Sequence, residues 1–208
     1  KNIKHLANFE FPKIKAFQYL KRKIINKLKI NKVTVTWAIR INQNNRSSWK
    51  NIHTKGGGIL YNYICHSLYY LEYLFGKMIF IESNYNLKRN SKGIIFKFYN
   101  NLKKVKILIF FQILPTKSKK NPIHKLKIFS NKGSISLSSK TENLNDRFSI
   151  KKMNKIIFKE KEEEEDFRLK PTFENLKIFE NSICSKRLKK PNFLDAKRIH
   201  FFIHQMTS

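Results

Sequence analysis

The spacing of apolar residues predicts alternating strands and helices in the first third of the chain. Residues 3–11 alternate loosely and predict a short strand. Beyond Pro12, apolar residues recur every three or four positions, which predicts one amphipathic helix with that proline in its first turn. These residues are Ile14, Phe17, Leu20, Ile24 and Leu28. Alternation over Val33–Ile39 predicts a strand with one apolar face. A second helix is expected over about Gly58–Phe75, where Gly76 ends it.

The middle of the chain is a succession of predicted strands. Five segments are strand candidates, and Asn, Ser, Pro, Gly and Lys separate them. They are residues 78–85, 92–100, 104–114, 124–131 and 133–139. The separators at 100–104 and 130–133 predict hairpin turns. A further strand or pair of strands is expected over residues 148–160.

Two helices are predicted near the C-terminus. One begins at about Thr172 and carries an apolar face of Leu176, Phe179 and Ile183. The other spans residues 193–206, with Asn192 or Asp195 as its cap.

A run of strands bracketed by helices predicts an α+β fold, with a mixed, largely antiparallel open sheet and helices on one face. The strand at 104–114 carries apolar residues on both of its faces. We therefore expect a partner subunit to cover the second face of the sheet, and the chain to form a homo-oligomer.

Composition excludes a disordered chain and makes nucleic acid a weak candidate partner. The 208 residues are 41% hydrophobic and 13% aromatic, which is ample for a packed core. The formal net charge of +30 invites a nucleic-acid interpretation. The excess is mostly lysine scattered along the chain, and it accompanies frequent Asn, Ile and Phe, which all have A/T-rich codons. Solvated lysine faces therefore explain the charge better than a phosphate-binding surface.

Cysteine usage and hydropathy predict a cytoplasmic protein. Cys65 and Cys184 lie in apolar periodic segments and are expected to be buried thiols in a reducing compartment. The longest apolar run, Val105–Leu114, is too short to span a bilayer, and no signal peptide is recognisable. His200 and His204 have metal-like spacing on a helix, but no third ligand accompanies them, so no metal is expected.

The stretch KGGGILYNYICHSLYYLEYLFG at residues 55–76 carries the candidate chemistry. Three glycines at a helix start cost stability, so they indicate either a flexible loop end or a backbone that approaches a ligand. Asn62 and His66 lie four residues apart and share one helix face. On spacing alone, the favoured interpretation is a core histidine hydrogen-bonded to an amide.

This stretch resembles the signature of the glucose-fructose oxidoreductase / inositol dehydrogenase / MocA (Gfo/Idh/MocA) family of NAD(P)-dependent dehydrogenases. There a triple glycine opens a helix, an Asp usually follows, a His comes four residues later, and the apolar run ends in Gly. The matching positions are Gly56, Gly57, Gly58, His66 and Gly76. Residues 8–24, 32–40 and 191–206 are similar to the flanking and closing segments of the family, and Trp49-Lys50 stands near its usual Trp-Arg.

The chain departs from the family pattern at three places. The usual Asp is Asn62, and a common glycine two residues before the His is Ile64. The N-terminal Rossmann half and the Glu-Lys-Pro motif, which supplies a catalytic lysine, are not recognisable. The resemblance thus implies a C-terminal portion that lacks most of the Rossmann domain, and the chain begins at Lys1 rather than Met. Residues 1–30 would be the last strand and helix of a truncated nucleotide-binding domain, and residues 31–208 a substrate-binding and oligomerisation domain.

The resemblance implies transfer of a hydride between NAD or NADP and a hydroxyl-bearing carbon of a sugar, polyol or sugar nucleotide. His66 would be the catalytic base and Asn62 would orient it or the substrate. Trp49 and Lys50 would contact the cofactor, while Gly56, Gly57 and Gly58 would let the loop approach the substrate. The chain alone, without the cofactor domain, is expected to be inactive.

Two alternatives stay open. The chain could be a non-catalytic remnant that keeps only the fold and interface of the family. It could also be a basic nucleic-acid-binding protein, which requires tight binding that weakens steeply with salt.

Overall fold

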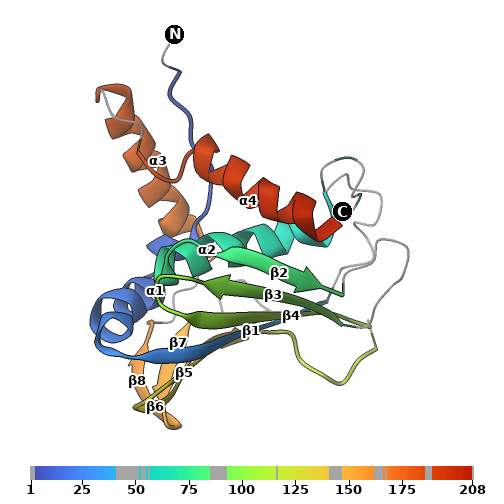
Figure 1. Cartoon of the computed structure of the whole chain (residues 1–208). Coiled ribbons are helices and arrows are strands. Elements are labelled where there is room, and N and C mark those ends of the chain that lie inside the picture. The colour runs from blue at the N-terminus through green and yellow to red at the C-terminus, as the bar shows by residue number, and fades with distance from the viewer. Residues whose placement is uncertain are drawn as a thin grey trace.

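The computed structural model of the chain describes residues 3–40, 52, 55, 57–84, 93–115, 117–140, 147–161, 166, 168–185 and 189–207. Within these residues, eight strands form one sheet, and the helices lie on one side of it (Figure 1). The strands are β1 (Ile30–Arg40), β2 (Ile79–Ser83), β3 (Ile94–Asn100), β4 (Val105–Leu114), β5 (Ile123–Ser130), β6 (Gly133–Lys140), β7 (Ser149–Lys152) and β8 (Lys155–Lys159). The α-helices are α1 (Lys15–Tyr19), α2 (Cys65–Phe75), α3 (Leu169–Ile183) and α4 (Phe193–Thr207).

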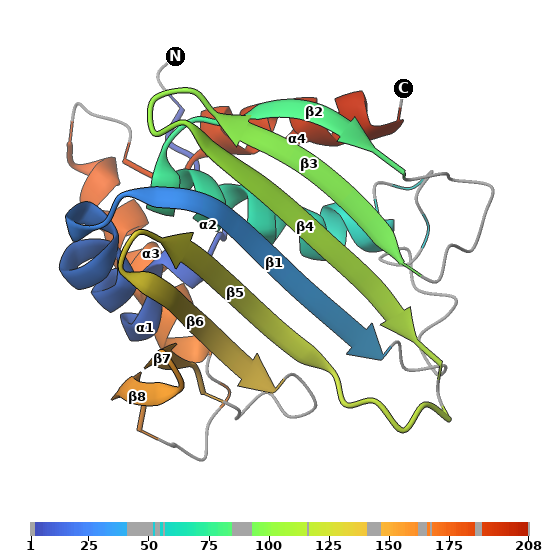
Figure 2. The same ribbon diagram turned by 60° about the horizontal axis from the view of Figure 1, so that its bottom comes forward.

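The sheet is mixed and largely antiparallel. Its strand order is β2-β3-β4-β1-β5-β6-β7-β8, so the first strand in sequence lies near the centre. β1 pairs in parallel with β4, and every other pair of neighbours in the described sheet is antiparallel. Figure 2 shows the open face of the sheet, with the helices behind it. The predicted α+β architecture with helices on one face is confirmed.

Alternating side chains place the core between the sheet and the helices. In β1, Val33, Val35, Trp37 and Ile39 are buried. The strands expected from Val33 onward form, including the β7–β8 pair over residues 148–160. The turns at 100–104 and 130–133 join β3 to β4 and β5 to β6 as hairpins.

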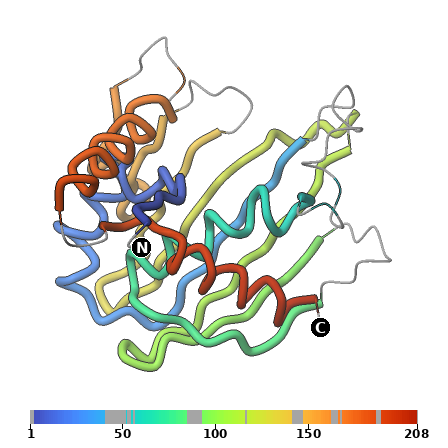
Figure 3. Tube along the Cα trace, turned by 90° about the horizontal axis from the view of Figure 1, so that it is seen from above, coloured from blue at the N-terminus to red at the C-terminus, as the bar shows by residue number. Residues whose placement is uncertain are grey.

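The N-terminal segment differs from its prediction. The structure assigns residues 3–10 to no strand, so the strand expected over residues 3–11 is wrong. A strand needs a neighbour with which to exchange backbone hydrogen bonds, and this segment runs along α3 and the start of α4 instead (Figure 3). There the Lys4 ammonium donates to the Ser185 carbonyl at 2.7 Å, and the Ala7 amide donates to the Pro191 carbonyl at 3.2 Å.

The helix expected beyond Pro12 forms in four short pieces. A 3-10 turn (η1, Phe11–Lys13) with Pro12 in its first turn precedes α1. A π-helical turn (η2, Leu20–Ile24) and a second 3-10 turn (η3, Ile25–Lys27) follow it.

The second helix runs over the predicted range. It begins at Gly58 and continues through a π-helical turn (η7, Leu60–Ile64) into α2. Gly76 ends it with a φ of 93°, a conformation that favours glycine, and its amide donates to the Glu72 carbonyl at 2.9 Å.

The two C-terminal helices form as expected, although the predicted apolar face of α3 is largely exposed. In α4, the Asn192 side chain accepts the Leu194 amide at 2.9 Å, and the Asp195 carboxylate accepts the Asn192 amide at 3.1 Å, so the two predicted caps act together. In α3, Leu176 and Ile183 on the predicted apolar face are 48% and 59% exposed.

The two cysteines lie in different environments. Cys65 is buried, as predicted, and burial raises the pKa of its thiol to about 12. Cys184 is exposed, so its expected burial is wrong: it follows the last residue of α3, whose predicted apolar face is itself exposed.

Across the described residues, the structure contains no helix with the length and apolar character that a bilayer crossing requires.

Candidate functional site

The glycine stretch forms a tight turn just before the second helix. The Ile52 carbonyl accepts the Lys55 amide at 3.1 Å and the Gly57 amide at 3.0 Å. Gly58 then has a φ of 83°, in the left-handed region where a side chain is strained. The glycine at this position is therefore required by the backbone, and its neighbour Gly57 is buried.

The helix continues from this turn as a π-helical segment that contains Asn62. In η7, the Cys65 amide donates to the Leu60 carbonyl, five residues earlier. Such π turns are rare and occur frequently at functional sites. Asn62 is half-buried within this turn, and His66 lies at the start of the regular helix α2.

His66 packs into an aromatic and acidic environment provided by the N-terminal segment. Its Nδ1 atom lies 3.5 Å from Oε2 of Glu10. The ring stands edge-on to Phe9, with centroids 5.8 Å apart, and tilted against Phe11 at 5.7 Å. The side chain of His66 is 22% exposed and that of Glu10 only 10%. One edge of the imidazole therefore faces a nearly buried carboxylate.

Nδ1 of His66 is a buried atom that makes no hydrogen bond within the described part of the chain. Protonation of the ring would place a positive charge at ion-pair distance from Glu10. Arg168 also lies within electrostatic reach of Glu10, but its guanidinium is held by the Asp166 carboxylate at 2.6–3.1 Å. The carboxylate within ion-pair distance of Nδ1 of His66 is thus that of Glu10.

A second histidine lies behind His66 in the core. His124, on β5, is 2% exposed and stacks on Trp37 with centroids 4.1 Å apart and an interplanar angle of 2°. Its Nε2 shares a hydrogen bond of 2.9 Å with the Tyr70 hydroxyl. Burial, with a smaller contribution from the charge of His66, lowers the pKa of His124 to about 3, and burial raises the pKa of Tyr70. His124 and Tyr70 are therefore an uncharged, hydrogen-bonded pair in the core behind His66.

The structure describes part of the predicted site. It places His66, Asn62, Gly57 and Gly58 on one continuous segment from the tight turn to α2. The other predicted residues, Gly56, Trp49 and Lys50, lie outside the described residues.

Glu10, Phe11 and His124 were not predicted as site residues. Glu10 and Phe11 lie in a segment whose pattern predicted only a short strand. His124 carries no signal either, since it is one of several isolated histidines in the sequence.

A family model matches most of the chain. A sequence model described as "Oxidoreductase family, C-terminal alpha/beta domain" (GFO_IDH_MocA_C) matches residues 21–197. No curated protein matches the sequence significantly.

Several solved structures share the fold at low sequence identity. A super-repressor mutant of Gal80p from Saccharomyces cerevisiae has a TM-score of 0.71 at 13% identity, over 99% of this chain and 63% of that protein. Aldose-aldose oxidoreductase from Caulobacter crescentus, in complex with glycerol, has a TM-score of 0.69 at 13% identity, over 97% and 60%. Levoglucosan dehydrogenase, in complex with NADH and levoglucosan, has a TM-score of 0.65 at 14% identity, over 96% and 62%. The chain thus spans less than two thirds of the length of each of these proteins.

Proposed function

Because the chain belongs to the Gfo/Idh/MocA oxidoreductase family, of which it contains the C-terminal alpha/beta domain, we propose that it is the substrate-binding part of a nicotinamide-dependent oxidoreductase. The substrate class is a sugar, polyol or sugar nucleotide. The observation that carries this proposal is the pairing of His66 with Glu10, on a helix that begins at Gly58, where Gly57 and Gly58 leave the backbone bare of side chains.

His66 is the general base in this proposal. NAD or NADP, when bound, would supply the acceptor for the hydride of the substrate's carbinol carbon. The hydroxyl proton of the same carbinol passes to His66, and the Glu10 carboxylate at 3.5 Å stabilises the imidazolium that results. Phe9 and Phe11 fix the ring orientation, and Asn62 orients the imidazole or the substrate hydroxyl.

The cofactor is held mainly outside this domain in the proposal. Residues 1–30 are the last part of a nucleotide-binding domain, and residues 31–208 form the substrate-binding domain. In support, the short helical pieces from Phe11 to Lys27 end just before the central strand begins at Ile30, and the similar solved proteins are longer than this chain. Trp49 and Lys50 reach the cofactor from the polar loop. Calorimetry of the 208-residue chain is expected to show no NAD(P) binding at micromolar concentration.

Nicotinamide reduction by the full-length protein that carries this chain tests the proposal, with a panel of sugars, polyols and sugar nucleotides. His66→Asn is expected to lower turnover by at least about a hundredfold. His204→Asn, which changes an exposed imidazole on α4, is the matched control and should leave turnover unchanged. Turnover that survives His66→Asn would exclude His66 as the base.

A specific observation favours a second candidate, a non-catalytic member of the family. Asn62 stands where the resemblance to the family places an Asp. A side-chain amide does not supply the negative charge of a carboxylate, so it stabilises a protonated imidazole less than Asp would. Under this reading, the full-length protein binds NAD or NADP yet reduces neither with any substrate of the panel.

We also propose that the open face of the sheet joins copies of the chain into a homo-oligomer. Phe110 on β4 is 36% exposed on this face, where it is paired with Ile95 and lies two residues from Leu108. Phe110→Lys is expected to shift the sedimentation of the protein to that of a monomer. Phe201→Lys, which changes a 59% exposed phenylalanine on α4, should leave the assembly intact.

A further inference from the structure

The side of α3 that faces the rest of the protein carries polar residues. The buried residues of this helix are Pro171, Asn175 and Ser182, whereas its apolar residues Phe173 and Leu176 are 61% and 48% exposed. Asn175 is 0% exposed. A buried amide costs free energy unless it is hydrogen-bonded, so the partner of this amide explains its presence better than burial does.

The partner of the Asn175 side chain is Asn8 in the N-terminal segment. Nδ2 of Asn175 donates to Oδ1 of Asn8 at 3.1 Å. One turn earlier on α3, Oγ1 of Thr172 accepts a hydrogen bond from Nδ2 of Asn8 at 3.4 Å. Both polar ends of the Asn8 amide are thus bound to α3. Oδ1 of Asn175 makes no hydrogen bond to any residue that the structure describes, so the bond to Asn8 is what this buried amide contributes.

The two residues that follow Asn8 reach the candidate site. The ring of Phe9 stacks on Tyr69 of α2, with centroids 4.3 Å apart and an interplanar angle of 15°. Oε2 of Glu10 lies 3.5 Å from Nδ1 of His66. Residues 3–10 belong to no helix or strand, so contacts with the neighbouring helices, rather than a regular backbone ladder, set the position of this segment.

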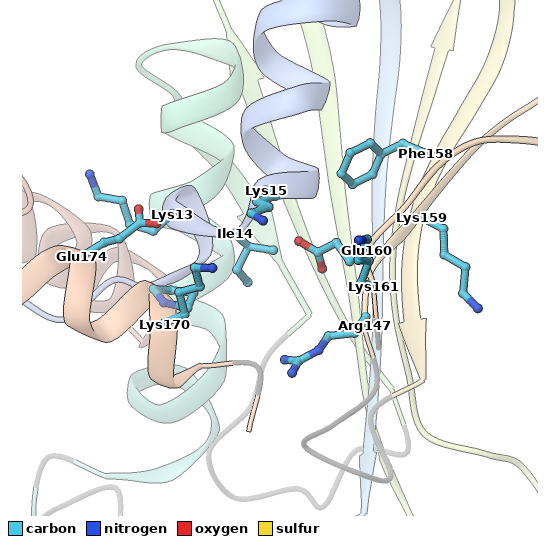
Figure 4. A pocket seen from close by; sticks show the side chains of 11 residues that line it. Lys13, Ile14, Lys15, Arg147, Phe158, Lys159, Glu160, Lys161, Lys170 and Glu174 are labelled. Carbon is cyan, nitrogen blue, oxygen red and sulfur yellow. The ribbon is translucent and has the colours of Figure 1, made fainter. Parts of the chain in front are cut away.

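The first turns of α3 also contact the chain just beyond Glu10. In the cavity of about 260 Å³ shown in Figure 4, Glu174 of α3 lies next to Lys13 of η1. Burial lowers the pKa of Lys13, and the charge of Glu174 acts in the opposite direction. α3 therefore contacts the chain on both sides of Glu10, at Asn8 and at Lys13.

We propose that Asn175 is a positioning residue, which acts through Asn8 to hold the Glu10 carboxylate at His66. The inference rests on the proposed role of Glu10 and His66, and it adds α3 to the elements that set the distance between them. Phe9 is held against α2 and Asn8 against α3, so the backbone that leads into Glu10 is fixed from two sides. Without Asn175, the exposed Asn8 amide can bind water instead, and the carboxylate loses one of its supports.

Nitrogen NMR of His66 in the 208-residue chain tests the inference without nicotinamide or substrate. Two-bond proton–nitrogen spectra at a fixed pH record the resonance of Nδ1, which is assigned by its loss in His66→Asn. Glu10→Gln is expected to move this resonance, because it removes the charge that faces Nδ1. Asn175→Ala should move it in the same direction. Asn8→Ala changes an exposed residue, so it should fold normally and have the same effect.

Asn100→Ala is the matched control, because Asn100 is also a fully buried asparagine. Its side chain donates to the carbonyls of Phe75 and Lys77, at the opposite end of α2 from His66. The control variant loses buried hydrogen bonds, yet it should leave the Nδ1 resonance of His66 in place.

Turnover of the full-length protein provides a second test, as a double-mutant cycle. Asn175→Ala is expected to lower turnover by about tenfold, since the loss of a supporting contact displaces the group that it holds. In the Glu10→Gln background the same change should cost less than about twofold, because the carboxylate that Asn175 positions is already absent. Full and equal losses in both backgrounds would show that Asn175 does not act through Glu10.

The outcomes separate this inference from the proposed function. A resonance that moves in Glu10→Gln but stays in place in Asn175→Ala would overturn the inference and leave the proposed function standing. Equal movement in Asn100→Ala would show a general loosening of the fold and would also overturn it. A resonance that Glu10→Gln leaves in place would remove the pairing on which both rest. If the full-length protein has no turnover, the NMR spectra still decide whether Asn175 positions Glu10.

Discussion

Acid should destabilise the protein through His124. Burial, with a smaller contribution from His66, lowers the pKa of this imidazole to about 3 in the folded chain, from an ordinary value of 6.5. Between these two pH values the unfolded chain binds a proton at this position that the folded chain excludes. The free energy of unfolding therefore falls as the pH falls, by about 1.4 kcal/mol per pH unit. From pH 6.5, where half of the unfolded chains already carry this proton, to about pH 4.5, the loss from His124 alone is about 2 kcal/mol.

Urea unfolding followed by circular dichroism at about pH 6.5 and about pH 4.5 measures this loss in the parent and in His124→Gln. The glutamine amide offers Tyr70 a polar partner near the position of Nε2 and cannot be protonated in this range. We expect the pH-dependent loss of stability to be about 2 kcal/mol smaller in the variant. His204→Gln, at an exposed position, should keep the full pH dependence of the parent. Equal losses in the parent and in His124→Gln would refute the assignment of a buried neutral imidazole.

Three further substitutions test the backbone and the caps, and thermal or urea unfolding measures each. Gly58→Ala places a side chain at a φ of 83° and should cost about 1–2 kcal/mol, whereas Gly93→Ala, where an added methyl group meets nothing within 4 Å, should be nearly neutral. Asn100 is fully buried, and its side chain donates to the carbonyls of Phe75 and Lys77 and accepts the Lys103 amide. Asn100→Ala removes these hydrogen bonds and should cost about 2–3 kcal/mol of unfolding free energy. A loss below about 0.5 kcal/mol would contradict this role. Asn192→Ala removes the cap of α4 and should cost about 1 kcal/mol, and an unchanged stability would show that Asp195 suffices.

The regular elements were predictable because their signals are local. The alternation of Val33, Val35, Trp37 and Ile39 follows from burial of one face of β1, and hairpin turns carry their own residue types. The failure at residues 3–10 has a different cause, since alternation describes side chains and does not show whether a neighbouring strand is available for hydrogen bonding.

The candidate site was only partly predictable, because its contacts connect distant parts of the chain. The resemblance of residues 55–76 to the family signature singled out His66, whereas spacing alone favoured a core histidine, and the structure places Gly58 and His66 on one segment. Its pairing with Glu10 joins a segment outside the regular elements to a helix, which no local spacing encodes. Trp49 and Lys50 remain predictions.

The central position of β1 has a consequence for how the protein is made. Both neighbours of this strand, β4 and β5, come later in the sequence, after α2 and the β2–β3 pair. A chain that leaves the ribosome N-terminus first therefore presents β1 with two unpaired edges and an apolar face while the middle of the protein is still being synthesised. Central pairing of this kind depends on contacts of long sequence separation, which slows folding. Nascent chains arrested before Val105 should accordingly be prone to aggregation and retained by chaperones, and release should follow once β4 and β5 have emerged.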